Sequence, residues 1–116
     1  MIEIHHLRWS ERELHTRIPF KYGIATMVKV PHVWVELSAT IDGERVTGQA
    51  ADHLPPKWFT KDPNRGLEDE IAEMRDVLTQ AGAAATGARG DSVHAVMHGV
   101  AQQQETWASG QGHPSL

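Results

Sequence analysis

The chain contains no cysteine, which excludes disulfide bonds, thiolate metal sites and a cysteine nucleophile. It also lacks a long apolar run, because no stretch approaches the roughly 18 consecutive apolar residues of a membrane-spanning helix. Residues 1–6 show neither the basic nor the apolar region of a signal peptide. These absences predict a soluble, cytoplasmic protein without a membrane partner.

Clustered positive charge is missing as well. The chain has 11 lysines and arginines against 15 aspartates and glutamates, a formal net charge of −4, and the basic residues are scattered along the sequence. Binding of nucleic acid or anionic lipid usually requires a basic patch. We therefore expect no nucleic-acid partner.

The middle of the chain is predicted to form a β-hairpin. From Val33 to Ile41 apolar residues alternate with polar residues and one tryptophan, which is typical of a strand with one buried face. The dipeptide Asp42-Gly43 then indicates a tight two-residue turn, since both residue types tolerate positive φ. Residues 44–50 are expected to return antiparallel to the first strand of this hairpin.

A further long strand is predicted at the start of the chain. Ile2 and Ile4 share a phase of alternation that Leu7 and Trp9 break, which indicates a bend or a bulge. Paired with the hairpin, this strand would complete a three-stranded antiparallel meander sheet.

The second half of the chain has the apolar spacing of helices. Apolar residues recur every three or four positions in a first helix, which Asp62 or Asn64 would cap and Gly82 would end. Asp91-Ser92 would cap a second helix that stops near Gly110. The Ala- and Gly-rich residues 83–90 would connect the two helices.

These elements predict one α+β domain over residues 1–116, in which a sheet half is followed by a helical pair. The sheet half would span residues 1–60 and the helical half residues 61–110. A chain of 116 residues is long enough to bury a single core without covalent cross-links.

Two loops join an aromatic-bearing segment with Gly or Pro to a strand. They read Ile-Pro-Phe-Lys-Tyr-Gly-Ile-Ala-Thr-Met at residues 18–27 and Ala-Ala-Asp-His-Leu-Pro-Pro-Lys-Trp-Phe at residues 50–59. Loops of this kind more often contact a ligand or a partner than hold a core. With the Asp-Gly hairpin between them and the helices behind, the chain resembles the N-terminal capping domain of the enolase superfamily, in the mandelate racemase and muconate lactonizing enzyme branch. The resemblance covers nearly the whole chain.

The resemblance implies a domain that packs over the open end of a catalytic (β/α) barrel and supplies substrate selectivity. In that family of racemases, cycloisomerases and dehydratases, the barrel removes the proton next to a substrate carboxylate with a lysine or histidine base. Magnesium bound by the barrel holds the resulting enediolate.

A barrel takes about 250 residues, so the family's Lys-x-Lys base motif and acidic metal ligands have no place within 116 residues. We expect this chain alone to hold no magnesium and no catalytic residue, and to be inactive without its barrel. Three explanations stay open. The chain is a fragment or truncated reading frame, the cap half of a split enzyme whose barrel acts in trans, or a stand-alone module that binds a small acid or a protein.

The resemblance also implies which residues contact the substrate. Phe20 and Tyr22 would provide apolar walls and a hydroxyl, and His53 a titratable group, while Lys57 would meet a substrate carboxylate. Each has a structural alternative, because aromatic residues at strand ends also fill cores and a lysine is usually a solvated charge. The full set of candidate substrate contacts is Phe20, Tyr22, Gly23, Thr26, Asp52, His53, Lys57 and Trp58.

A cap separated from its barrel is expected to expose an apolar face and to self-associate. The candidates for this face are Trp34, Trp58, Trp107 and Leu116. A separate pair, His94 and His98, is a weak zinc candidate, since the two residues share a helix face but no third ligand is evident.

Overall fold

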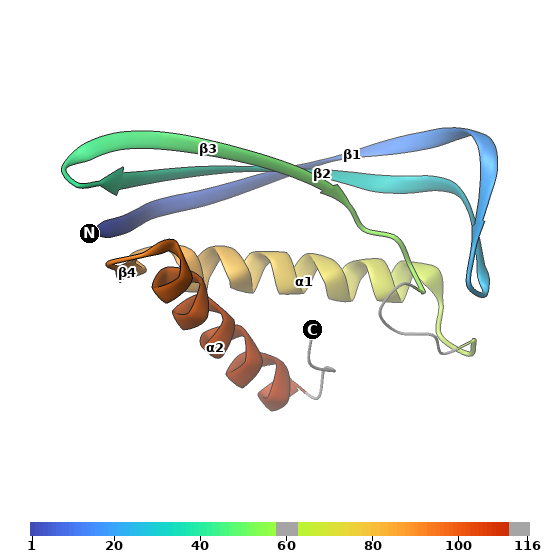
Figure 1. The fold of residues 1–116 in the computed structure, drawn as a ribbon. Helices are drawn as coiled ribbons and strands as arrows, with labels where there is room; N and C mark the ends of the chain where they lie inside the picture. Colours follow the sequence, from blue (N-terminus) through green and yellow to red (C-terminus); the bar gives the residue numbers. More distant parts are fainter. Residues whose placement is uncertain (58–62, 112–116) are drawn as a thin grey trace.

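A computed structural model of the chain describes residues 1–57 and 63–111. Its elements are β1 (Ile2–Tyr22), β2 (Ala25–Ile41), β3 (Glu44–His53), α1 (Leu67–Ala85), β4 (Arg89–Gly90) and α2 (Val93–Gln111). Figure 1 shows the strands as one curved layer with both helices on the same side of it. The predicted α+β class and the antiparallel pairing are confirmed.

The sheet has four strands in the order β3-β2-β1-β4, so the prediction of three strands was wrong. The fourth strand consists of Arg89 and Gly90, which pair with Glu3 and Ile2 of β1. Two residues are too few to show the alternation that reveals a strand. This strand lies within residues 61–110, where the sequence predicted only helices and their connection.

The turns follow the sequence closely. Asp42 and Gly43 have φ of 50° and 83°, which confirms the predicted turn between β2 and β3. The turn between β1 and β2 contains Gly23 with φ of 51°. The expected bulge in β1 lies between Ile4 and His6, where the register shifts and the alternation changes phase.

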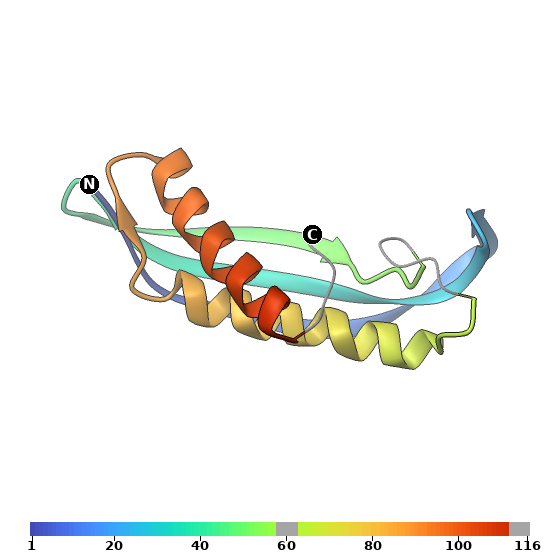
Figure 2. The same ribbon diagram turned by 90° about the horizontal axis from the view of Figure 1, so that it is seen from below.

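Alternate residues of β2 face the two sides of the sheet. Leu37 packs against the core beneath the sheet, and its even-numbered neighbours therefore point to the outer face, away from the helices. One core cluster is made of small or medium-sized side chains from β1, α1 and α2: Ile4, Ala84, Ala85, Val96 and Val100. It lies toward the end of the molecule that holds the N-terminus (Figure 2). Five more apolar residues are buried outside this cluster, in β2, in the segment after β3 and in α1: Val30, Val33, Ala39, Leu54 and Ile71.

The helix boundaries differ from the predicted ones at α1. Gly66 precedes the helix without a side-chain cap, so Asn64 is not the cap, and Asp62 lies outside the described residues. The helix also continues past Gly82 to Ala85. In α2 the predicted cap is confirmed, because Ser92 Oγ accepts a hydrogen bond of 3.0 Å from the backbone N–H of Ala95.

The overall shape is extended. The Cα radius of gyration is 16.1 Å, against about 13 Å for a compact domain of this length. Figure 1 shows why, since the β1–β2 ribbon runs along the length of α1 and bends down near the start of this helix. Within the described ranges, no helix has the length and apolar character needed to cross a membrane.

Candidate functional site

The end of the first hairpin and the segment after β3 lie at the same end of the molecule. The hydroxyl of Tyr22, the last residue of β1, donates a hydrogen bond of 2.6 Å to the carbonyl oxygen of Pro56. Figure 1 shows the hairpin reaching this position by bending over the start of α1. The segments at residues 18–27 and 50–57, which the sequence singled out separately, are therefore in contact. Both were predicted as loops, but residues 18–22 belong to β1, residues 25–27 to β2 and residues 50–53 to β3, so only the turn at Gly23 and the part after His53 are loops.

A buried ion pair fixes the second of these loops to α1. Lys57 Nζ lies 2.6 Å from Glu70 Oε2, and the two side chains are only 7% and 5% exposed. The ammonium also donates to the carbonyl oxygen of Arg65 at 2.6 Å, and the backbone N–H of Lys57 donates to Glu70 Oε1 at 3.1 Å. Carboxylate and ammonium thus hold the loop against the first turn of the helix.

The backbone at Lys57 adds to this constraint. Its φ of 65° lies in the left-handed region, which residues with a Cβ rarely adopt. Such a conformation persists where the surroundings determine it. At Lys57, the contacts to Glu70 and Arg65 hold the backbone in this conformation.

The same cluster affects Tyr22. Burial raises the pKa of the Tyr22 phenol, and the negative charge of Glu70 raises it further. A phenol is protonated at neutral pH even at its ordinary pKa of about 10, and it donates to Pro56; the raised pKa keeps this donor to higher pH.

Three other candidates lie beside Tyr22 on the same hairpin. Phe20 is 57% exposed, and its ring stacks near that of Tyr22, with 6.1 Å between centroids and 26° between planes. Gly23 forms the turn, and Thr26 is exposed on the opposite strand in register with Lys21. The hairpin end is therefore an exposed surface with an apolar ring and a hydroxyl.

Asp52 and His53 lie elsewhere, at the end of β3. Asp52 Oδ1 accepts a hydrogen bond of 2.7 Å from the backbone N–H of His53, so the carboxylate bonds within the strand. The ring of His53 contacts the ring of His32 on β2 edge to face. Trp58, the remaining candidate, lies outside the described residues.

Glu70 was missed as a site residue, although the sequence contained a signal for it. Glu70 lies in the first turn of α1, where the helix dipole favours acids. Glu70 also falls three residues after Leu67 and four before Met74, which places it in the apolar stripe of α1. A buried acid at such a position needs a partner.

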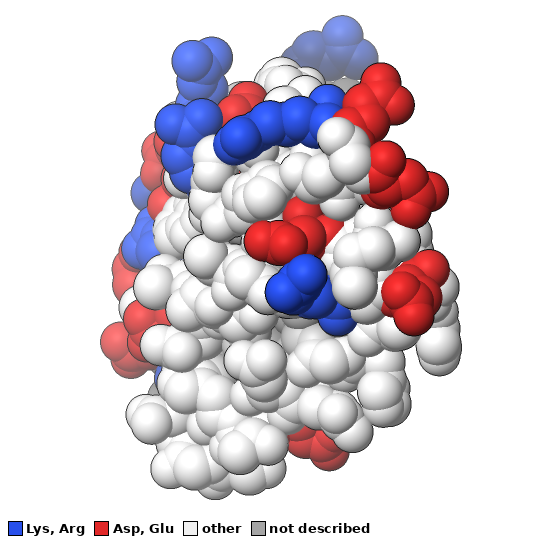
Figure 3. All heavy atoms as spheres, turned by 90° about the vertical axis from the view of Figure 1, so that its left-hand side faces the viewer, with Lys and Arg blue, Asp and Glu red and all other residues white. Residues whose placement is uncertain are grey.

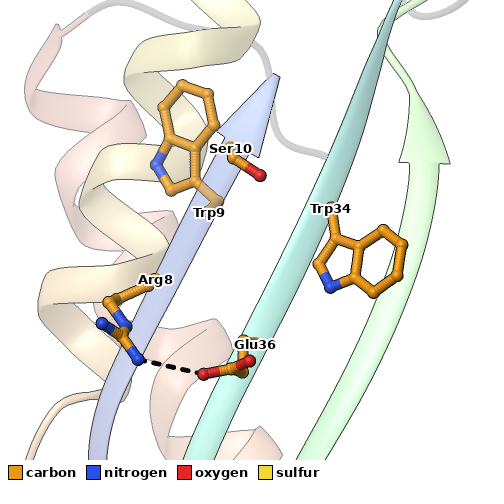
Figure 4. A pocket seen from close by; sticks show the side chains of 5 residues that line it. All are labelled: Arg8, Trp9, Ser10, Trp34 and Glu36. Carbon is orange, nitrogen blue, oxygen red and sulfur yellow. Dashed lines mark hydrogen bonds and ion pairs between the residues drawn. The ribbon is translucent and has the colours of Figure 1, made fainter. Parts of the chain in front are cut away.

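A second feature is a shallow hollow of about 280 Å³ on the outer face of the sheet. Figure 4 shows Ser10 between the indoles of Trp9 and Trp34, with Arg8 and Glu36 at one end. Arg8 Nη2 donates to Glu36 Oε1 at 3.0 Å. The signal in the sequence was Trp34, an aromatic residue at a position where the alternation of the strand predicts a polar one.

Two of the four candidates for an exposed apolar face lie in the described part of the chain. Trp34 is 49% exposed, whereas Trp107 is half-buried, and Trp58 and Leu116 lie outside the described ranges. Helix α2 carries a single charged residue, Glu105. Figure 3 shows the resulting largely uncharged surface over α2 in its lower part.

Metal ligands are sparse in this part of the chain. Within residues 1–57 and 63–111, no group of three or more His, Cys, Asp or Glu residues could hold a metal ion. The rings of His94 and His98 stack on the exposed side of α2 at 6.2 Å, with an interplanar angle of 20°. This pair therefore gains no third ligand from the described residues.

Comparison of the chain with protein-family models, curated proteins and solved structures found no match. The structure has two candidate sites. One is the end of the molecule where Tyr22 is bonded to Pro56, and the other is the shallow hollow beside Trp34 on the sheet.

Proposed function

We propose that this chain is the capping domain of an enolase-superfamily enzyme of the mandelate racemase and muconate lactonizing enzyme branch. The end that carries Tyr22 and Lys57 closes over the mouth of a barrel and selects the substrate. Proton abstraction next to the substrate carboxylate, and the magnesium ion that supports it, belong to the barrel. That barrel is either joined to this chain in a longer protein or supplied as a separate chain.

The contact between the two loops is the observation that carries this proposal. A cap that closes an active site must place its substrate-facing segments side by side, so that they exclude water together. The hydrogen bond from Tyr22 to Pro56 and the ion pair between Lys57 and Glu70 hold two distant segments in this way.

Exposed apolar side chains beside the contact support the same conclusion. Phe20 and Ile24 are 57% and 59% exposed at the hairpin end, and Ile18 is 69% exposed. Apolar side chains that gather at one exposed place are typical of a surface that another body covers. The extended shape of the chain, with a Cα radius of gyration of 16.1 Å, fits a domain that a larger partner completes.

In this proposal the site residues divide into two groups. Lys57, Glu70 and Tyr22 position the loops, because their polar atoms are engaged within the protein. Since Glu70 already neutralises the ammonium of Lys57, we assign Lys57 to loop positioning rather than to the substrate carboxylate. Phe20 and Thr26 remain available to a substrate or to the barrel.

The test is a titration of the purified chain into a barrel of the mandelate racemase branch from which the barrel's own cap has been deleted. With Mg²⁺ and a carboxylate substrate in deuterated water, we expect saturable binding and restored exchange of the α-proton. Replacing both Phe20 and Ile24 by alanine should weaken binding about tenfold or more, the size expected for apolar anchor residues.

The matched control replaces Val93 and Met97, which are 67% and 56% exposed on α2, by alanine. This control should bind as the unmodified chain does. Equal loss in both double variants, or exchange catalysed by the chain without a barrel, would contradict the proposal. A stand-alone binding module would instead melt at the same temperature with and without the barrel.

A further inference from the structure

We propose that His32 and His53 form a binding site for a divalent transition-metal ion on the outer face of the sheet. The two residues lie directly opposite each other on β2 and β3. Their ring centroids are 5.0 Å apart, and the ring planes meet at 69°. This site is separate from the proposed cap function and does not depend on it.

The register of the strands explains why the rings lie so close. The backbone N–H of Leu54 donates a hydrogen bond of 2.9 Å to the carbonyl oxygen of Pro31, so these two residues form a hydrogen-bonded pair. In antiparallel sheets such pairs alternate with pairs that lack hydrogen bonds and whose side chains are closer. His32 and His53 occupy the next pair along the strands, which is of the closer kind.

One buried ring nitrogen points to a missing ligand. Nδ1 of His32 is buried and, within the described part of the chain, has no hydrogen-bond partner. His53 is exposed, so the outer side of the pair is open to solvent. A buried polar atom without a partner in the protein indicates that water or an ion completes the arrangement.

Neutral imidazole is the preferred protein ligand of Zn²⁺, Ni²⁺ and Cu²⁺, and Cu²⁺ binds such ligands most tightly. Two imidazoles would supply two coordination positions, and water would complete the shell. Magnesium prefers oxygen ligands and should not bind here. An ion held between the two strands would fix the end of β3, directly before the loop that contains Lys57.

Arg12 is a charged residue on β1 next to this pair. It is the register partner of His32 on β1, on the side opposite β3. Its positive charge opposes a bound cation and would favour a bound anion. Replacement of Arg12 by glutamine therefore distinguishes a cation site from an anion site.

The experiment measures thermal unfolding of the full chain with NiCl₂, in a background where His94 and His98 are replaced by alanine. This background removes the second histidine pair, on α2. At about 100 times the dissociation constant, Ni²⁺ should raise the melting temperature by about 10 °C, whereas MgCl₂ should leave it unchanged. His53→Gln should abolish the shift, and His32→Gln provides a second test of the same ligand pair.

Arg12→Gln in the same background should tighten Ni²⁺ binding by about threefold, because it removes a nearby positive charge. An unchanged Ni²⁺ shift in His53→Gln would overturn the proposal. Weaker Ni²⁺ binding in Arg12→Gln, or an equal shift with MgCl₂, would overturn it as well.

Discussion

The hydroxyl of Tyr22 donates a hydrogen bond of 2.6 Å to the carbonyl oxygen of Pro56, which joins the end of the first hairpin to the segment after β3. The two residues are 34 positions apart in the sequence. Because Lys57 follows Pro56 and is bound to Glu70, the contact extends from the sheet through the loop to the start of α1.

Removal of this hydrogen bond should loosen the loop. Tyr22→Phe keeps the ring but leaves the Pro56 carbonyl without its partner, and should lower the free energy of unfolding by about 1 kcal/mol. Urea unfolding measures the loss, and amide hydrogen exchange should become faster at Leu54 and Lys57. Unchanged stability together with unchanged exchange would show that the hydroxyl does not hold the loop.

The raised pKa of Tyr22 predicts a loss of stability at alkaline pH. The unfolded chain releases the phenol proton near pH 10, the ordinary value, whereas the folded chain holds it to higher pH because of burial and the charge of Glu70. The folded state thus binds more protons above about pH 10, so the free energy of unfolding falls as pH rises from there through the folded-state pKa.

Tyr22 is the single tyrosine of the chain, so the ultraviolet absorbance of tyrosinate reports its titration directly. The stability difference between the unmodified chain and Tyr22→Phe should shrink over the same pH range. A phenol that titrates at its ordinary pKa would be inconsistent with its burial beside Glu70.

Breaking the buried ion pair should cost far more than breaking an exposed one. Glu70→Gln leaves the ammonium of Lys57 buried without its counter-charge, and should lower the free energy of unfolding by about 3 kcal/mol. The control is Glu36→Gln, which breaks the pair with Arg8, a side chain that is 72% exposed. This control should cost less than about 1 kcal/mol.

The double replacement Lys57→Met with Glu70→Leu should recover much of the loss, because it removes both buried charges together. Denaturant unfolding is measured for the unmodified chain, Glu70→Gln, Glu36→Gln and the double variant. If Glu70→Gln and Glu36→Gln lowered the free energy of unfolding by similar amounts, the ion pair of Lys57 with Glu70 would be solvated rather than buried.

The β2–β3 turn should depend on the positive φ of Gly43. A Cβ at Gly43 would meet no atom within 4 Å, so Gly43→Ala tests backbone strain alone, at a φ of 83°. We expect a loss of about 1 kcal/mol. Gly48→Ala is the matched control, since its Cβ also meets nothing and its φ is outside the positive region. Equal stabilities of the two variants in urea would be evidence against a strained turn.

Those parts of the fold that depend on local chemistry could be predicted from the sequence. Asp42-Gly43 marked the turn, and the change of phase after Ile4 marked the bulge, because each depends only on neighbouring residues. The strand formed by Arg89 and Gly90 could not be predicted. It depends on packing, since a Cβ at Gly90 would lie 3.1 Å from Val96 Cγ2 of α2.

The candidate site, too, was predictable only where it depends on neighbouring residues. Its loops were visible from their Gly, Pro and aromatic residues, but the partners within them were not. The pairing of Lys57 with Glu70 spans 13 positions and joins a loop to a helix, so no local pattern reports it. The contact of Tyr22 with Pro56 additionally depends on how far the hairpin bends, which the sequence does not specify.

The central claim is that this chain caps a barrel that lies outside residues 1–116. Sequencing the DNA that adjoins the codon for Leu116, and the genome that carries it, tests this claim most directly. We expect a (β/α) barrel with a Lys-x-Lys motif and successive acidic metal ligands, without a cap of its own, in the same frame, in a shifted frame or in another gene. A genome with no such barrel, or with a separate cap on every one, would contradict the claim.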